Sequence, residues 1–175
     1  EIAKTGAILA SYSYPSFDPN KRDMTSYLDR NISVPFEPGS TMKIFSYLAA
    51  MEHGVYNGDE TYRSGTFTAK EGTVIGDWDR NGWGYITYNQ GFALSSNTAV
   101  MNLTCKYMGA DVLKEFYTKL GFGSKTGIEL PKEASGKISF KYETEVLNAS
   151  FGQGIMTTPI QNVKALTAIS NNGDL

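Results

Sequence analysis

A turn that leads directly into an apolar segment is the feature of this sequence that most constrains its fold. Pro38 and Gly39 form the turn, and residues 44–51 have the length and apolar content of a buried helix. We therefore expect Ser40 in the first turn of this helix. Lys43 follows three positions later and lies on the same helix face. The spacing predicts a hydroxyl and an amine within reach of each other, which is the arrangement of a nucleophile beside a base.

Two interpretations of this pair are open at this point. Lys43 stands among Met42, Ile44 and Phe45 near the positive end of a helix dipole, and both burial and the dipole favour its neutral form. A neutral lysine can act as the base that activates a serine. Alternatively, Ser40 and Lys43 belong to the polar stripe of an amphipathic helix, because Ser-x-x-Lys is common by chance.

Composition excludes several classes of protein. With 175 residues, 41% of them hydrophobic, the chain has enough apolar surface for one domain with a core. The net charge is −2 without a basic run, so we expect no nucleic-acid partner. No apolar run approaches the roughly 18 residues of a membrane helix, and the first residues lack the pattern of a signal peptide.

Single residues limit the possible chemistry further. One cysteine, Cys105, excludes an internal disulfide. Because His53 is the one histidine, we do not expect a histidine-based catalytic triad. His53 stands before Gly54, where we expect it to end a helix. We expect neither a metal site nor a cofactor.

Hydrophobic periodicity, capping residues and turn residues predict most of the elements. We expect a buried strand at Ala7–Ala10, with a partner before Glu1, and a hairpin of residues 67–69 and 73–75. Further helices are expected to begin at residues that can act as N-caps: Thr87 with Gln90, Ser96 or Asn97, Asp111, and Thr158 with Gln161.

The segment Leu94–Asn97 interrupts a helical pattern. Residues two apart on a continuous helix point to different sides, so Ser95 and Asn97 can act together only from a loop, which this break supplies. The same residues also fit an ordinary helix cap between two packed helices. Both interpretations stay open on this segment alone.

Two tryptophans follow in an irregular segment. Trp78 and Trp83 belong to residues 76–84, which are too rich in glycine and polar residues for regular structure. The two side chains either cap a small cluster of the core or form the rim of a binding cleft.

The two motifs together resemble a known superfamily. Ser40-x-x-Lys43 followed by Ser95-x-Asn97 at a helix break is similar to the penicillin-binding and serine β-lactamase superfamily. Flanking segments resemble the transpeptidase domain of class B penicillin-binding proteins, from about residue 5 to residue 173: residues 5–10, 14–20, 36–43, 120–123 with 126–131, and 151–154 with 158–159. The resemblance implies an α/β fold of the α+β type, with a helical subdomain and part of an antiparallel sheet.

The third motif of the superfamily is Lys-Thr/Ser-Gly. Residues Lys125-Thr126-Gly127 match it by letters, but they follow Asn97 too closely and come after a Gly-Phe-Gly turn, so we expect them to be structural. We expect residues 1–175 to form a single, incomplete transpeptidase domain that continues beyond both ends, with its third motif beyond Leu175. Because that motif supplies one oxyanion donor, whose loss costs about 100- to 1,000-fold in rate, we expect these residues alone to be inactive.

The resemblance also implies a mechanism. Ser40 would attack the D-Ala-D-Ala carbonyl of a peptidoglycan stem peptide while Lys43 accepts its proton. Ser95 would relay a proton to the leaving amine, and Asn97 would donate its amide to the substrate backbone or to Lys43. Trp78 would belong to the rim of the substrate cleft. An amine of a neighbouring strand would complete the crosslink, and a β-lactam would acylate Ser40.

Partners and location follow from the same resemblance. It implies peptidoglycan stem peptides, β-lactam antibiotics and proteins of cell-wall synthesis or division as partners. It implies the extracytoplasmic face of the bacterial cell membrane as the location, with an anchor outside this sequence. Two alternatives stay open: a serine β-lactamase, although no carboxylate stands where it would activate water, and a non-catalytic β-lactam sensor or interaction module.

Overall fold

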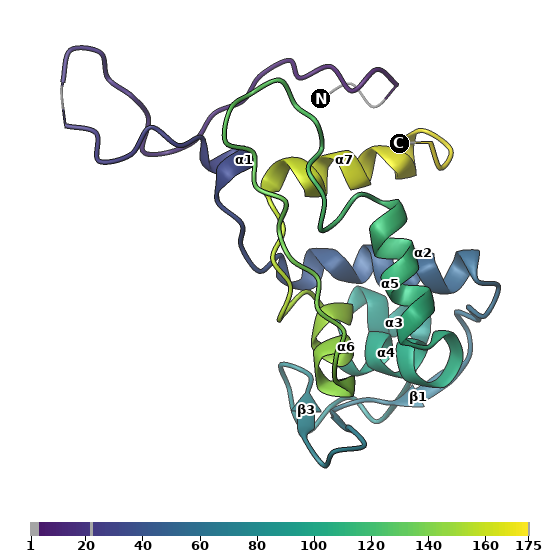
Figure 1. The fold of residues 1–175 in the computed structure, drawn as a ribbon. Coiled ribbons are helices and arrows are strands. Elements are labelled where there is room, and N and C mark those ends of the chain that lie inside the picture. The colour runs from purple at the N-terminus through teal and green to yellow at the C-terminus, as the bar shows by residue number, and fades with distance from the viewer. Residues whose placement is uncertain (1–3, 22, 175) are drawn as a thin grey trace. The chain divides into compact units, whose positions relative to one another are not determined.

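The computed structural model describes residues 4–21 and 23–174, which divide into two compact units. The first unit comprises the described residues within 1–36, 118–137 and 156–175, and the second comprises residues 37–117 and 138–155. The described residues form helices and short antiparallel strands, as Figure 1 shows. The predicted α+β class is therefore confirmed. Among the described residues, none of the helices is both long enough and apolar enough to cross a bilayer.

Packed helices form the core of the second unit. The 3₁₀ turn η1 (Gly39–Thr41) leads into α2 (Met42–Glu52), which packs against α4 (Asn97–Asn102), α6 (Glu143–Ser150) and the π-helix η2 (Leu103–Met108) (Figure 1). The helix predicted after Ser40 is therefore confirmed. Large side chains of these helices and of α5 (Ala110–Lys119) are buried in the core: Met42, Phe45, Tyr47, Met101, Leu103, Leu113, Tyr117 and Leu147.

Two pairs of antiparallel strands lie in the same unit. Strand β2 (Thr66–Thr68) pairs with β3 (Val74–Gly76), which confirms the predicted hairpin. Strand β1 (Thr61–Arg63) pairs with β4 (Tyr85–Thr87), and this pair was not expected from the sequence. Its two strands are separated by the whole β2–β3 hairpin, so no tight turn marks the pairing.

Helix boundaries follow the capping residues. Thr87 and Gln90 form a capping box at the start of α3 (Tyr88–Ala93), and Ser96 caps α4 by accepting a hydrogen bond from the Ala99 N–H. The predicted break between these helices is confirmed. His53 is the C-cap of α2, as expected. Helix α5 (Ala110–Lys119) begins one residue before the predicted cap, so Asp111 lies in its first turn.

The first unit contains α1 (Arg30–Ser33) and α7 (Pro159–Ser170), which contact each other. The predicted capping box of Thr158 and Gln161 begins α7, and the Gly173 N–H closes the helix on the Ala168 carbonyl over 2.8 Å. The buried Gln161 amide also donates to the Ser124 and Ser135 carbonyls, at 2.6 and 2.8 Å.

The strand predicted at Ala7–Ala10 is wrong. Residues 8–10 belong to no strand, and Ile8 and Leu9 are 40% and 73% exposed. A strand is stabilised by hydrogen bonds to a neighbouring strand, and within the described part of the chain no named strand pairs with these residues.

Candidate active site

Ser40 and Lys43 lie one helical turn apart at the start of α2. Ser40 belongs to η1 and is exposed, whereas Lys43 is only 3% exposed. Gly39 adopts a φ of +59°, a conformation that suits glycine and turns the chain into the helix. The Lys43 Nζ lies 3.1 Å from the Ser40 Oγ. The contact predicted from the spacing is therefore present.

Burial changes the proton affinity of this lysine. Removal from water lowers the pKa of Lys43 from 10.5 to about 8, although the negative charge of Asp77 opposes the shift. With a pKa of about 8, roughly a tenth of the amine is neutral at pH 7 and about half at pH 8. This state is required of a base.

Three oxygens surround the Lys43 amine. Besides Ser40 Oγ, they are the Ser95 carbonyl oxygen at 2.5 Å and the Ser95 Oγ at 3.0 Å. A neutral amine has two N–H donors and one lone pair. Donation to the two oxygens of Ser95 leaves the lone pair for the hydroxyl proton of Ser40. The geometry fits a base placed between two hydroxyl groups.

Ser95 reaches Lys43 because of its backbone conformation. It lies in the turn between α3 and α4 with a φ of +54°, in the left-handed region that residues other than glycine rarely adopt. Such a conformation costs about 1–3 kcal/mol and persists only where the surroundings enforce it. The break in the helix thus gives Ser95 the loop position that was expected of it.

Asn97 begins α4 and is half-buried. Its Nδ2 donates to the Gly76 carbonyl at the end of β3 over 2.8 Å, so the structure gives this amide a partner other than Lys43. Contact of Asn97 with a substrate stays a prediction.

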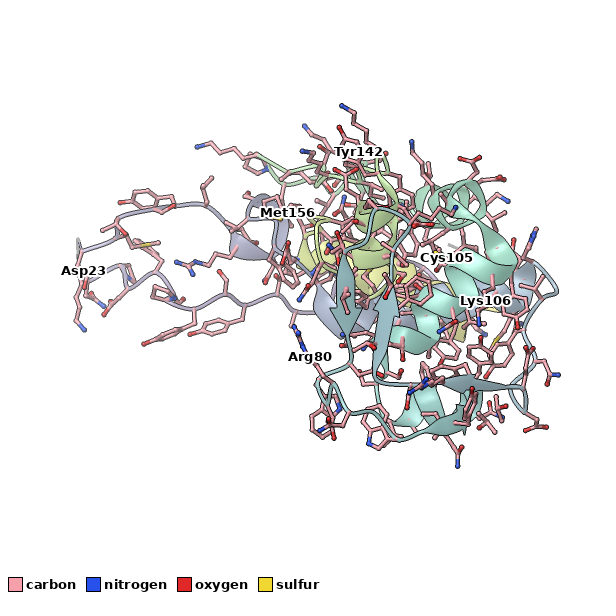
Figure 2. All side chains as sticks on the ribbon, turned by 90° about the horizontal axis from the view of Figure 1, so that it is seen from below. Asp23, Arg80, Cys105, Lys106, Tyr142 and Met156 are labelled. Carbon is pink, nitrogen blue, oxygen red and sulfur yellow. The ribbon has the colours of Figure 1, made fainter. Side chains whose placement is uncertain are left out.

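The loop after β3 presents the two tryptophans. Trp78 is 75% exposed and meets the half-buried Trp83 edge to face, with ring centroids 5.7 Å apart. Arg80, labelled in Figure 2, belongs to the same loop. Of the two interpretations, Trp78 as a cap of the core does not fit its exposure. A role at the rim of a cleft stays a prediction.

Lys125-Thr126-Gly127 lies in an irregular segment of the first unit, after the turn at residues 121–123. The N–H and hydroxyl of Thr126 and the N–H of Gly127 all donate to the Glu133 carboxylate, at 2.6, 2.6 and 3.1 Å. The tripeptide belongs to no strand. These contacts fit the structural role that is expected of this segment.

Asp77 is a residue of the site that sequence analysis missed. It is buried beside Trp78 and bonded to the residues that follow Ser95. Nothing in the local sequence marks it, because its partners lie 19 and 21 positions away. Across residues 4–21 and 23–174, no group of three or more His, Cys, Asp or Glu side chains could hold a metal ion.

Comparison with known proteins assigns the family. The family model described as the penicillin binding protein transpeptidase domain matches residues 2–175. The chain belongs to this family. Two relatives are Stage V sporulation protein D of Bacillus subtilis, 37% identical over 98% of this chain, and peptidoglycan D,D-transpeptidase MrdA of Acinetobacter baumannii, 28% identical over 97% of it.

The match covers only part of each relative. This transpeptidase-family chain spans 28% of the length of the sporulation protein and 30% of that of MrdA. A crystal structure of a peptidoglycan glycosyltransferase from Burkholderia ambifaria superposes with a TM-score of 0.84 and 26% sequence identity. That match covers 98% of this chain and 51% of the other. The resemblance to penicillin-binding proteins is thus confirmed.

Proposed function

We propose that this transpeptidase domain forms peptidoglycan crosslinks through an acyl-enzyme on Ser40, and that β-lactams acylate the same serine. The observation that supports it most directly is the position of the buried Lys43 amine, 3.1 Å from Ser40 Oγ and 3.0 Å from Ser95 Oγ. Relatives named penicillin-binding protein and D,D-transpeptidase support the same reaction class.

The first half of the reaction makes the acyl-enzyme. Ser40 Oγ attacks the carbonyl carbon between the two terminal D-alanines of a stem peptide, while its proton passes to Lys43 Nζ. The C–N bond then breaks, and the proton returns through the Ser95 hydroxyl to the leaving D-alanine nitrogen. The Ser95 Oγ is suited to this relay because it already contacts Lys43.

In the second half, the amine of a neighbouring stem peptide attacks the ester carbonyl. The new C–N bond forms, the Ser40 C–O bond breaks, and the amine proton passes back to Ser40 through Lys43. Asn97 would contact the donor peptide, and the exposed Trp78 would border the cleft. A β-lactam undergoes only the first half of the reaction: it acylates Ser40, and its acyl group stays on the serine.

The proposed peptidoglycan substrate also indicates where in the cell the protein acts. We propose that the protein acts on the extracytoplasmic face of the bacterial membrane, anchored by a segment outside these 175 residues. Proteins of cell-wall synthesis or division are its proposed partners there.

A fluorescent penicillin tests the proposal on the full-length protein. We expect durable labelling, located on Ser40 by mass spectrometry, that Ser40→Ala abolishes and that Ser16→Ala in the first unit leaves intact. Release of D-alanine from a stem peptide, with formation of a crosslinked product when an amine acceptor is added, would identify the transpeptidase reaction. Rapid turnover of the label would indicate a β-lactamase instead. A folded protein that takes no label would overturn the proposal.

A further inference from the structure

Asp77 is a buried carboxylate that the reaction above does not use. It follows Gly76 at the end of β3 and is only 4% exposed. Neither of the ion pairs formed within the described residues includes it. Because burial of a carboxylate is costly unless hydrogen bonds or charges compensate it, the contacts of this group need an explanation.

Four hydrogen bonds reach this carboxylate. Oδ1 accepts from Ser96 Oγ at 3.0 Å and from the Thr98 N–H at 2.9 Å. Oδ2 accepts from Thr98 Oγ1 at 2.8 Å and from the Gly65 N–H at 2.9 Å. Each oxygen therefore accepts one backbone N–H, and a backbone donor cannot be turned round. An asparagine here would bring its NH₂ group against the N–H of either Thr98 or Gly65.

The residues that Asp77 holds follow Ser95 directly. Ser96 and Thr98 bind the carboxylate, and between them Asn97 binds the neighbouring Gly76 carbonyl at 2.8 Å. Residues 96–98 are thus fastened to the end of β3. This attachment explains how Ser95 keeps its φ of +54° and keeps both its oxygens on Lys43.

We propose that Asp77 is a positioning residue for acyl transfer, which holds the turn after Ser95 against β3 and provides the negative charge that acts on Lys43. The proposal rests on the proposed function, because it assigns Asp77 a part in the activation of Ser40. Asp77 touches neither Ser40 nor the place where a substrate would react, so it acts through Ser95 and Lys43.

The charge of Asp77 has a direct effect on the base. Burial lowers the pKa of Lys43 to about 8, and Asp77 is the group whose charge raises it. Removal of that charge would lower the pKa further. The elements packed against α2 carry few other ionisable groups: α4 and η1 carry none, and the remainder are Cys105, Lys106 and Tyr107 on η2, and Glu143 and Glu145 on α6.

Four of these other groups have partners of their own: Tyr107 donates to Glu60, and Cys105 donates to Glu143. Glu143 forms a salt bridge with Lys70 at 3.2 Å, and Glu145 accepts from the backbone N–H groups of Lys141 and Tyr142. Lys106 is exposed. Loss of the Asp77 charge should therefore appear as a change in the pH dependence of reactions that use Lys43 as a base.

The test compares Asp77→Asn with Asp79→Asn in the full-length protein. The rate of acylation by a fluorescent penicillin is measured from about pH 6 to about pH 10. For Asp77→Asn we expect the plateau rate to fall by about 10- to 100-fold, because Ser95 is displaced. We expect the midpoint to move to lower pH than in the wild type. Asp79→Asn removes the same charge two positions away, from a carboxylate that accepts from the Asn81 N–H, and should change neither value.

Thr98→Val separates positioning from charge. It removes the hydroxyl that binds Asp77 Oδ2 and keeps the carboxylate, so we expect a plateau about tenfold lower with an unmoved midpoint. This variant also decides the positioning role if Asp77→Asn does not fold. A wild-type rate in Thr98→Val, or a folded Asp77→Asn with an unmoved midpoint, overturns the proposal. Absence of wild-type labelling overturns the proposed function instead.

Discussion

Gly152 and Gly39 are in direct backbone contact immediately before the candidate nucleophile. The Gly39 N–H donates to the Gly152 carbonyl over 2.9 Å, and a Cβ placed on Gly152 would lie 2.0 Å from the Gly39 carbonyl oxygen. Gly152 also has a φ of +85°. Since Gly39 precedes Ser40, this contact fixes the backbone from which the Ser40 hydroxyl projects.

Gly152→Ala should therefore destabilise the protein and slow acylation. Left-handed backbone costs a residue with a Cβ about 1–2 kcal/mol, and the overlap with Gly39 adds about 1–3 kcal/mol. Denaturant unfolding and penicillin acylation of the same preparation measure both effects. Gly154→Ala is the matched control, because its φ is +70° but its nearest neighbour, the Asn148 Cβ, is 3.8 Å away. Equal stability of the two variants would contradict the steric argument.

Acylation should follow the titration of Lys43. Because burial lowers the pKa of this amine to about 8, the acylation rate should rise with pH and level off above that value. Lys43→Arg keeps the charge but cannot act as a base near neutral pH, so acylation should fall by about 10²- to 10⁴-fold. A stopped-flow pH series with the fluorescent penicillin measures both.

The exposed Lys106 on η2, labelled in Figure 2, provides the control. Lys106→Arg should leave the pH profile unchanged, and a wild-type midpoint near 10.5 would exclude a buried base.

The lowered pKa of Lys43 also affects stability. Between pH 8 and 10.5 the unfolded chain binds more protons at Lys43 than the native state does, so the contribution of Lys43 to stability rises with pH across that range.

The parts of the site that the sequence predicted are local. Ser40 and Lys43 meet because residues three apart share a helix face, and the capping boxes at Thr87 and Thr158 connect residues three apart as well. Ser95 was predicted to act from a loop because the helical pattern breaks beside it. Each of these inferences needs only a few consecutive residues.

The missed features depend on residues far apart in the sequence. The start of helix α6 is held partly by the β2–β3 hairpin. Glu71, in the turn of the hairpin, accepts hydrogen bonds from the N–H and the hydroxyl of Thr144, which lies 73 positions away in the first turn of α6. Asp77 likewise acquires its role from Thr98, 21 positions away. A single sequence contains no signal for such contacts, because they form only when the helices and the hairpin pack.

Tyr117 connects three helices of the second unit through its hydroxyl. The hydroxyl lies 2.7 Å from Ser46 Oγ on α2 and 3.2 Å from the Ala149 carbonyl on α6, and the residue is fully buried. Tyr117→Phe should cost about 1–3 kcal/mol of unfolding free energy, because it leaves buried polar partners with fewer hydrogen bonds. Urea denaturation measures the loss. Tyr142→Phe removes a hydroxyl from a residue that is 58% exposed and should cost far less; similar losses would refute the role of burial.

Glu133 is expected to stabilise the segment Lys125-Thr126-Gly127 in a pH-dependent way. Burial alone would raise the pKa of Glu133, but hydrogen bonds from Thr126 and Gly127 outweigh it and hold the pKa below its ordinary value. The stabilisation is therefore complete above the ordinary glutamate pKa of about 4.3 and is lost as pH falls through the lowered value. Glu133→Gln should cost about 1–3 kcal/mol at neutral pH and less in acid, as measured by urea denaturation. The exposed Glu129→Gln is its control, and a cost of Glu133→Gln that persists in acid would show that charge is not involved.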